Sequence, residues 1–145
     1  MDDCIFCAIL EGREEASFVY RDETVSAFMD IQPINAGHIL VVPSEHAAFL
    51  ADLEPETGGR IFQTGQRLAE ALQNSDLRCE GINFFLADGE AAHQEIFHVH
   101  LHVFPRYKGD GFHIQVGSQY HERPSRDSLE SHAAALRKVL KEAPG

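Results

Sequence analysis

Apolar residues follow two kinds of spacing along the chain, and each spacing predicts a type of element. Short runs rich in β-branched and aromatic residues predict strands, and Asp22-Glu23 between the first two runs indicates a β-hairpin. Pro33 and Asn35-Ala36-Gly37 mark a loop. The predicted strands span residues 18–21, 24–29, 38–42, 81–87 and 97–104.

Apolar residues three or four positions apart predict helices elsewhere. Ser44 can cap a short helix that runs to about Leu53. Pro55 opens a longer helix, because the missing N–H of proline costs nothing in a first turn. A last helix starts at Asp127 or Ser128 and reaches about residue 141. The apolar stripes consist of Ile61, Leu68, Ala69 and Leu72 in the longer helix and of Leu129, Ala133, Leu136 and Leu140 in the last one.

The order of these elements lacks the regular strand–helix–strand alternation of parallel sheets. It predicts an α+β fold in which helices pack against a mainly antiparallel five-stranded sheet. The length of 145 residues suggests one domain. A chain of this size can bury roughly 70% of its unfolded surface, so it needs no disulfides to hold a core.

The net charge is −11 at pH 7, from 23 acidic and 12 basic side chains. Such a surface repels polyanions, so we expect no nucleic-acid partner, although a local site can still hold one small phosphate ligand. The first residues lack a basic stretch followed by an apolar run, and no apolar run reaches the length of a membrane span. We therefore expect a cytoplasmic protein with no membrane partner.

Three histidines alternate with apolar residues in the last predicted strand. Side chains alternate across a strand, so Val99 and its apolar neighbours face the core while His98, His100 and His102 share the other face. Clustered imidazoles repel one another when protonated, which favours a functional site over a purely structural strand. Two chemistries fit: a three-histidine zinc site that activates water, and nucleophilic attack by one imidazole while its neighbours move protons.

The segments beside the histidines favour the nucleophilic mechanism. A polar loop of small residues, Asp88 to Glu95, leads into the histidine strand. Such a loop can bring backbone N–H groups and the Gln94 amide to an oxyanion. Arg106 adds a cation just past the strand.

Cys4 and Cys7 have the spacing of one half of a tetrahedral zinc site. The chain has no second such pair, so histidines must complete the site, and His46 and His98 are the best candidates. The alternative is a pair of thiols without a metal. A thioredoxin-type redox role is disfavoured because no strand precedes the pair, and Cys79 is expected to be a packed thiol.

The alternating run from His98 to Phe104 resembles the signature of the histidine triad (HIT) family of nucleotide hydrolases and transferases. The similarity extends from residue 4 to about residue 112 in family order and spacing, which implies a HIT-like fold with its core there and a single domain over residues 1–145. The other similar blocks are Cys4-Ile5-Phe6-Cys7, Phe28-Met29-Asp30-Ile31, residues 37–43, His46 and Pro105-Arg106-Tyr107.

The resemblance implies a role for each catalytic candidate. His100 would attack the α-phosphorus to form a covalent nucleotidyl-histidine, which water would hydrolyse to a nucleoside monophosphate. His102 would contact the phosphate and assist proton transfer, and His38 would lie behind the nucleophile as part of the relay. Gln94 matches a glutamine that contacts the scissile bridge. This scheme needs no catalytic cofactor.

The resemblance also implies how a purine nucleotide and a metal would be held. Asp30 matches the carboxylate that holds the ribose hydroxyls. The other expected nucleotide contacts are Phe6, Phe28 and Ile31 around the base, together with Asn83. In similar proteins that bear the cysteine pair, positions matching Cys4, Cys7, His46 and His98 close a structural zinc site. A homodimer with a sheet continuous across its interface is implied as well.

Several positions depart from the family pattern. Ala87 stands where asparagine is common, His93 where glycine is common, and Glu95 where serine or threonine is common. A carboxylate at Glu95 would repel a phosphate unless it points away or is neutralised. Glu14-Glu15 replaces an apolar residue and a proline. These departures bear on the choice of substrate rather than on the type of reaction.

The sequence thus predicts a nucleotide hydrolase that acts on a phosphoramidate or phosphoanhydride, of the dinucleoside polyphosphate type among others. Two alternatives stay open: a zinc-dependent hydrolase with the three triad histidines as ligands, and a nucleotide-binding scaffold with little turnover. The leaving group and the choice between adenine and guanine are not specified by the sequence.

Overall fold

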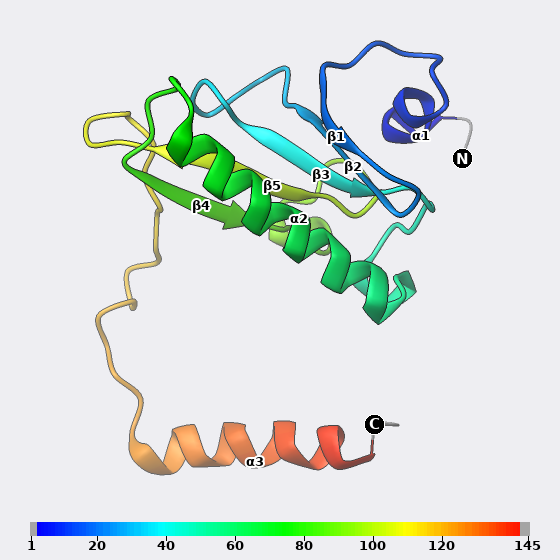
Figure 1. The fold of residues 1–145 in the computed structure, drawn as a ribbon. Helices are drawn as coiled ribbons and strands as arrows, with labels where there is room; N and C mark the ends of the chain where they lie inside the picture. Colours follow the sequence, from blue (N-terminus) through cyan, green and yellow to red (C-terminus); the bar gives the residue numbers. More distant parts are fainter. Residues whose placement is uncertain (1–2, 143–145) are drawn as a thin grey trace. The chain divides into compact units, whose positions relative to one another are not determined.

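The computed structural model describes residues 3–142, which divide into two units, one ending at residue 112 and the other starting at residue 113. In the first unit, five strands form one antiparallel sheet in the order β1-β2-β3-β5-β4 (Figure 1). This confirms the predicted α+β class and the five-stranded sheet; a single domain over the whole chain stays a prediction. The strands are β1 (Phe18–Arg21), β2 (Val25–Met29), β3 (Ile39–Pro43), β4 (Gly81–Phe85) and β5 (Leu101–Arg106).

Helices cover the sheet on both faces. Helix α2 (Pro55–Asn74) lies along one face (Figure 1) and starts at the predicted proline. Its buried stripe packs on Val41, Leu101 and their neighbours in the main core. Because side chains alternate along a strand, the next residues of β3 face the other way. There, helix α1 (Ile5–Leu10) forms a second cluster, which consists of Phe6, Ile9, Phe28, Leu40 and Val42.

The strand register aligns one row of side chains across the sheet on the α1 face. Leu40 pairs with Phe28 on β2 and with His102 on β5, and His102 pairs in turn with Phe85 on β4. Cross-strand partners share a face of the sheet. His102 therefore lies between an apolar β2 side and the β4 edge.

The histidine segment is less regular than the sequence predicts. Strand β5 begins at Leu101, so only His102 lies on a regular strand, whereas His98 and His100 precede it. The ladder between β3 and β5 stops at the pair of Val41 and Leu101, although β3 continues to Pro43, because the Val99 N–H donates to the Ala47 carbonyl at 2.8 Å instead of to β3. The predicted alternation still holds, because Val99, Leu101 and Val103 are all buried in the main core.

The short helix predicted from Ser44 to Leu53 is wrong. The segment contains only one 3₁₀ turn, Leu50–Asp52. The carbonyl of Ala47 accepts from the Val99 N–H, and the carbonyl of Ala48 accepts from Gln94 Nε2 at 2.8 Å. Both carbonyls are thus bound by the loop before β5 and are not used in helical hydrogen bonds.

The second unit contains helix α3 (Arg126–Glu142), which starts one or two residues before the predicted Asp127 or Ser128. Its residues Leu136, Val139 and Leu140 are exposed. Within residues 3–142, none of the helices combines the length and the apolar character that crossing a membrane requires.

Candidate functional site

A cavity of about 800 Å³ opens on the α1 face of the sheet. Phe6, Phe28 and Ile31 line its apolar side, and His38, His100 and His102 line its polar side. This volume lies within the usual range for small-molecule sites, which is roughly 300–1,000 Å³. The structure thus brings most of the predicted nucleotide and catalytic residues into one cavity.

Backbone contacts fix the proton positions on His38 and His102. The Ile34 N–H donates to His38 Nδ1 at 3.0 Å, so this nitrogen carries no proton. In the neutral ring the proton sits on Nε2, which lies 2.9 Å from His102 Nδ1 and donates to it. His102 then carries its own proton on Nε2. The series of hydrogen bonds from Ile34 through His38 to His102 therefore ends in one N–H donor, Nε2 of His102.

The proton on His100 is fixed by the peptide of another triad histidine. His100 Nδ1 lies 2.8 Å from the carbonyl oxygen of His98, and since a carbonyl can only accept, Nδ1 must be the donor. The neutral ring therefore keeps its lone pair on Nε2. The Phe6 ring packs edge-on against the His100 ring, with their centroids 5.1 Å apart. His100 is held in one orientation with one nucleophilic nitrogen.

Burial keeps these imidazoles neutral. It lowers the pKa values of His38 and His100 below the ordinary value of 6.5, although the nearby Asp30 carboxylate acts in the opposite direction. Burial, assisted by the neighbouring His100 and His38, lowers the pKa of His102 to about 4. All three rings are thus uncharged near pH 7, the state that a nucleophile and a neutral hydrogen-bond relay require.

Asp30 follows the end of β2 and faces both the cavity and the relay. Its Oδ2 lies 3.4 Å from His38 Nε2 and 3.9 Å from His102 Nδ1, while Oδ1 accepts from the Gln32 N–H at 2.8 Å. On the same side Phe28 is buried, whereas Ile31 is 94% exposed at the rim. The carboxylate therefore sits between the apolar wall and the histidines.

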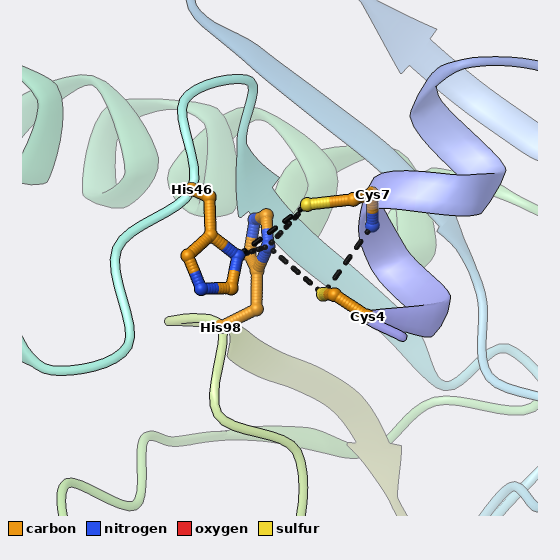
Figure 2. A group of neighbouring side chains, drawn as sticks. All are labelled: Cys4, Cys7, His46 and His98. Atoms are coloured by element: carbon orange, nitrogen blue, oxygen red, sulfur yellow. Dashed lines mark hydrogen bonds between the residues drawn. The ribbon is translucent and has the colours of Figure 1, made fainter. Parts of the chain in front are cut away.

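The cysteine pair meets two histidines at the end of α1, as Figure 2 shows. Cys4 caps the helix, and its Sγ accepts from the Cys7 N–H at 3.4 Å. His46 comes from the loop after β3, and His98 from the segment before β5. The four ligand atoms, two Sγ and two Nδ1, all lie within 4.8 Å of one another.

The donor atoms of this cluster have the right separations for tetrahedral zinc. Zinc bonds of about 2.3 Å to sulfur and 2.05 Å to nitrogen place S and N about 3.5 Å apart and two N about 3.3 Å apart. His98 Nδ1 lies 3.4 Å from Cys4 Sγ, 3.6 Å from Cys7 Sγ and 3.2 Å from His46 Nδ1. His46 Nδ1 lies 3.4 Å from Cys7 Sγ. These four residues form a candidate metal site.

The proton positions in the cluster also suit a metal. His98 Nε2 donates to the Pro43 carbonyl at 3.0 Å, which leaves the lone pair of Nδ1 facing the sulfurs. Burial and the adjacent Cys4 thiol raise the pKa of Cys7 to about 11. A divalent cation reverses this effect, because it stabilises thiolates directly.

The structure separates the three triad histidines between two environments. Both nitrogens of His98 are directed away from the cavity, one to Pro43 and the other to the cysteines, while His100 and His102 line the cavity. Among residues 3–142, no group of potential metal ligands contains all three. A catalytic metal held by the whole triad therefore finds no support in the geometry.

Three polar residues expected at the site have partners elsewhere. Gln94 is buried, and its amide bonds the Gly89 N–H and the carbonyls of Ala48 and Ile96. Asn83 Oδ1 accepts from Arg106 Nη1 at 2.7 Å. The Arg106 guanidinium also binds Asp110 and the Phe112 carbonyl. None of Gln94, Asn83 and Arg106 lines the cavity.

Other lining residues were not assigned a role from the sequence. Phe85 lines the cavity and lies opposite His102 in the register of β4 and β5. This position follows only from the pairing of the two strands. Glu14 and the departures from the family pattern, Ala87, His93 and Glu95, also line the cavity. His93 adopts a left-handed backbone with φ of 73°, a conformation that favours glycine.

Comparison with known proteins gives a consistent assignment. A model of the HIT domain matches residues 11–109. An uncharacterized HIT-like protein of Borreliella burgdorferi is 40% identical over 121 residues, which cover 82% of this chain and 86% of the relative.

Two solved structures resemble the fold closely. A zinc-bound histidine triad family protein from Mycobacterium smegmatis is 37% identical, with a TM-score of 0.74 over 95% of this chain and 98% of the other. A histidine triad nucleotide-binding protein from Candida albicans is 27% identical, with a TM-score of 0.84 over 97% and 99%.

Proposed function

This chain belongs to the histidine triad (HIT) family, and we propose that it cleaves nucleotides at the α-phosphorus through a covalent nucleotidyl-histidine. The substrate is a nucleoside phosphoramidate or phosphoanhydride, and the product is a nucleoside monophosphate. Family membership indicates the general type, a nucleotide-binding hydrolase or transferase. The geometry of the cavity supports the specific mechanism.

The observation that carries the proposal is the hydrogen bond between His100 Nδ1 and the His98 carbonyl. This bond keeps the proton on Nδ1, so the free lone pair of the buried, neutral imidazole is on Nε2. Asp30 and His102 line the same cavity. A neutral imidazole with a fixed tautomer is the form that attacks phosphorus. A purely structural histidine would not need to keep this nitrogen free.

The reaction proceeds in two displacements. His100 Nε2 forms a bond to the α-phosphorus, and the bond from phosphorus to the leaving group breaks, with the leaving group taking a proton from solvent. Water then attacks phosphorus and returns a proton to solvent, and the bond to Nε2 breaks to release the nucleoside monophosphate. His102 Nε2–H donates to a phosphoryl oxygen throughout, and His38 fixes its orientation through the bond to Nδ1.

The same cavity holds the nucleoside. The Asp30 carboxylate accepts hydrogen bonds from the ribose hydroxyls, and a purine lies against Phe6, Phe28 and Ile31, whose aromatic and aliphatic surfaces suit a flat base. Gln94 acts as a positioning residue, because its amide ties the loop at Gly89 to Ala48 rather than facing the ligand. Asn83 acts in the same way through Arg106.

We propose zinc as the ion at Cys4, Cys7, His46 and His98. The zinc-bound relative from Mycobacterium smegmatis supports the choice of metal, and the S–N and N–N separations support the set of ligands. Bound there, zinc stabilises the two thiolates and links α1 to the segment that carries His100. Its role is structural.

Homodimer formation, expected from the family, is tested by light scattering of the purified protein.

Intact-mass spectrometry after acid quenching during turnover tests the mechanism. We expect a nucleotidyl adduct on the wild-type chain, mapped to His100, and none on His100→Ala. His132→Ala, a change at an exposed histidine of α3, serves as the matched control and keeps the adduct. Full turnover by His100→Ala without an adduct would contradict the mechanism. Nucleotide binding without hydrolysis across a substrate panel would favour a scaffold.

A further inference from the structure

The hydrogen bond between His38 and His102 can run in two directions. Two neutral imidazoles that share one hydrogen bond have two arrangements, since either ring can be the donor. In the first, His38 Nε2 donates to His102 Nδ1, and His102 Nε2 carries a proton. In the second, His102 Nδ1 donates to His38 Nε2, and His102 Nε2 is a bare acceptor. The distance of 2.9 Å between His38 Nε2 and His102 Nδ1 is compatible with both arrangements.

The backbone of Ile34 selects the first arrangement. Its N–H lies 3.0 Å from His38 Nδ1 and can only donate, so this nitrogen has to be bare. The Asp30 carboxylate selects less sharply, because its Oδ2 lies near both atoms of the shared bond, 3.4 Å from His38 Nε2 and 3.9 Å from His102 Nδ1. The direction of the relay therefore depends on where one backbone N–H is held.

Asn35, the next residue, ties this backbone to the rest of the sheet. Asn35 is buried, and its Nδ2 donates to the Pro105 carbonyl at 2.9 Å and to Asp110 Oδ2 at 2.8 Å. Within the described residues, the other hydrogen bonds of residues 31–37 go to atoms of residues 30–38 and stay inside the loop. The Asn35 amide thus supplies the hydrogen bonds that fasten the loop to a distant segment.

The acceptor on Asp110 is itself firmly held. The Asp110 side chain is 3% exposed, and Arg106, the last residue of β5, binds it through Nε at 2.6 Å and Nη2 at 3.0 Å. The Arg106 guanidinium and the Asn35 amide keep the pKa of the Asp110 carboxyl well below its usual range. Because Asp110 is ionised, its bond from Asn35 is charge-assisted and stronger than a neutral one.

We propose that Asn35 is a positioning residue for the relay. Its amide holds the loop so that the Ile34 N–H meets His38 Nδ1, and in consequence His102 presents an N–H, and not a lone pair, to the cavity. The effect on turnover rests on the proposed function, in which this N–H donates to a phosphoryl oxygen that a bare nitrogen would repel. The direction of the relay in the free protein does not rest on it.

Nitrogen NMR of the imidazole rings tests the direction of the relay. Long-range proton–nitrogen spectra at pH 7 distinguish a protonated ring nitrogen from a bare one, and the signals absent from His38→Asn identify His38. We expect a bare Nδ1 and a protonated Nε2 in the wild type. Asn35→Leu keeps the approximate shape and removes both donors, so both arrangements become populated and the two nitrogen signals of His38 shift toward each other. Unchanged His38 signals in Asn35→Leu overturn the inference.

Turnover supplies the second measurement. Asn35→Leu should lower kcat/KM about tenfold, because His102 then offers its donor for only part of the time. Asp22→Ala is the matched control, since Asp22 also fastens a loop, through the N–H groups of Thr24 and Val25, but does not line the cavity. It should lower stability and leave kcat/KM unchanged. An equal loss of kcat/KM in both variants would attribute the effect to general loosening and overturn the inference.

A second variant and the choice of measurements keep the test decisive. If Asn35→Leu is isolated unfolded, Asn35→Ser, which is smaller and polar, should shift the His38 signals in the same direction. If the wild type forms no nucleotidyl adduct, the proposed mechanism fails, but the His38 signals still report the direction of the relay. If the adduct forms on His100 and His38 keeps one protonated nitrogen in both Asn35 variants, the mechanism stands and the role of Asn35 is refuted.

Discussion

Within the described residues, two clusters of potential metal ligands lie on the α1 side of the sheet, and both keep their donor atoms within 4.8 Å of one another. One consists of Cys4, Cys7, His46 and His98, and the other of Asp30, His38 and His102. Spacing alone therefore does not distinguish a metal site from a catalytic relay. The backbone partners of the histidines do.

In the cysteine cluster, the Pro43 carbonyl takes the proton of His98 Nε2, and a bare Nδ1 faces the sulfurs. In the aspartate cluster, the Ile34 N–H occupies His38 Nδ1 and leaves the proton on Nε2, the atom that faces the cluster. The 2.9 Å between His38 Nε2 and His102 Nδ1 suits a hydrogen bond and is shorter than two ligands of one zinc ion require. The first cluster suits a metal, and the second suits a hydrogen-bond relay.

The largest expected effect comes from a substitution in the cysteine cluster, which tests whether this cluster binds a metal. Cys4→Ser should remove bound zinc and lower the free energy of unfolding by roughly 3–5 kcal/mol, because a structural metal contributes directly to folding. Elemental analysis and urea denaturation measure both quantities. Cys79→Ser is the matched control, since Cys79 lies outside the cluster, and it should keep the metal. Zinc retained by Cys4→Ser would contradict the assignment.

The next largest effect comes from a substitution in the aspartate cluster, which tests whether this cluster serves catalysis and not metal binding. His38→Asn should leave the zinc content unchanged and lower kcat/KM about 100-fold, because His102 loses the donor that orients it. Steady-state kinetics and elemental analysis on the same preparation test both parts. His113→Asn, at an exposed histidine, should behave as wild type. Loss of zinc from His38→Asn would show that the two clusters are not distinct in function.

Much of this arrangement could be predicted from the sequence. Strand runs and the proline-initiated helix depend on local pattern, and the structure confirms them except at the histidine strand, which begins at Leu101 instead of residue 97. The cysteine spacing indicated half a metal site, and the structure places His46 and His98 beside it. Alternation correctly placed Val99 and Leu101 in the core.

The differences come from hydrogen bonds between segments far apart in the chain. The carbonyls of Ala47 and Ala48 bind the loop before β5, so no helix forms there. Gln94 and Arg106 have partners that no local pattern reveals, and for this reason neither lines the cavity. The proton positions on the histidines depend equally on distant backbone atoms, such as the Pro43 carbonyl for His98.

A smaller effect concerns pH. Above pH 6.5, His102 is neutral in both the folded and the unfolded chain, and its contribution to stability is complete. As pH falls from 6.5 toward the folded-state pKa of about 4, the unfolded chain binds a proton that the folded chain does not. The free energy of unfolding should therefore fall by about 1.4 kcal/mol per pH unit for this residue. Urea denaturation from pH 7.5 to 4.5 should show that the free energy of unfolding depends less steeply on pH in His102→Asn than in the wild type. Identical slopes would refute the lowered pKa of His102.

The smallest expected effect distinguishes a structural zinc from a catalytic one. Chelation at moderate temperature should change kcat/KM by less than about threefold while the protein stays folded, although thermal stability falls. The reason is that the bond from His100 Nδ1 to the His98 carbonyl is made by the backbone, and the adjacent Val99 N–H is held independently by Ala47. A zinc-activated water would instead require the metal in every turnover. If chelation abolishes hydrolysis in a chain that circular dichroism shows to be folded, and added zinc restores it, the metal takes part in the chemistry and the separation of the two clusters fails.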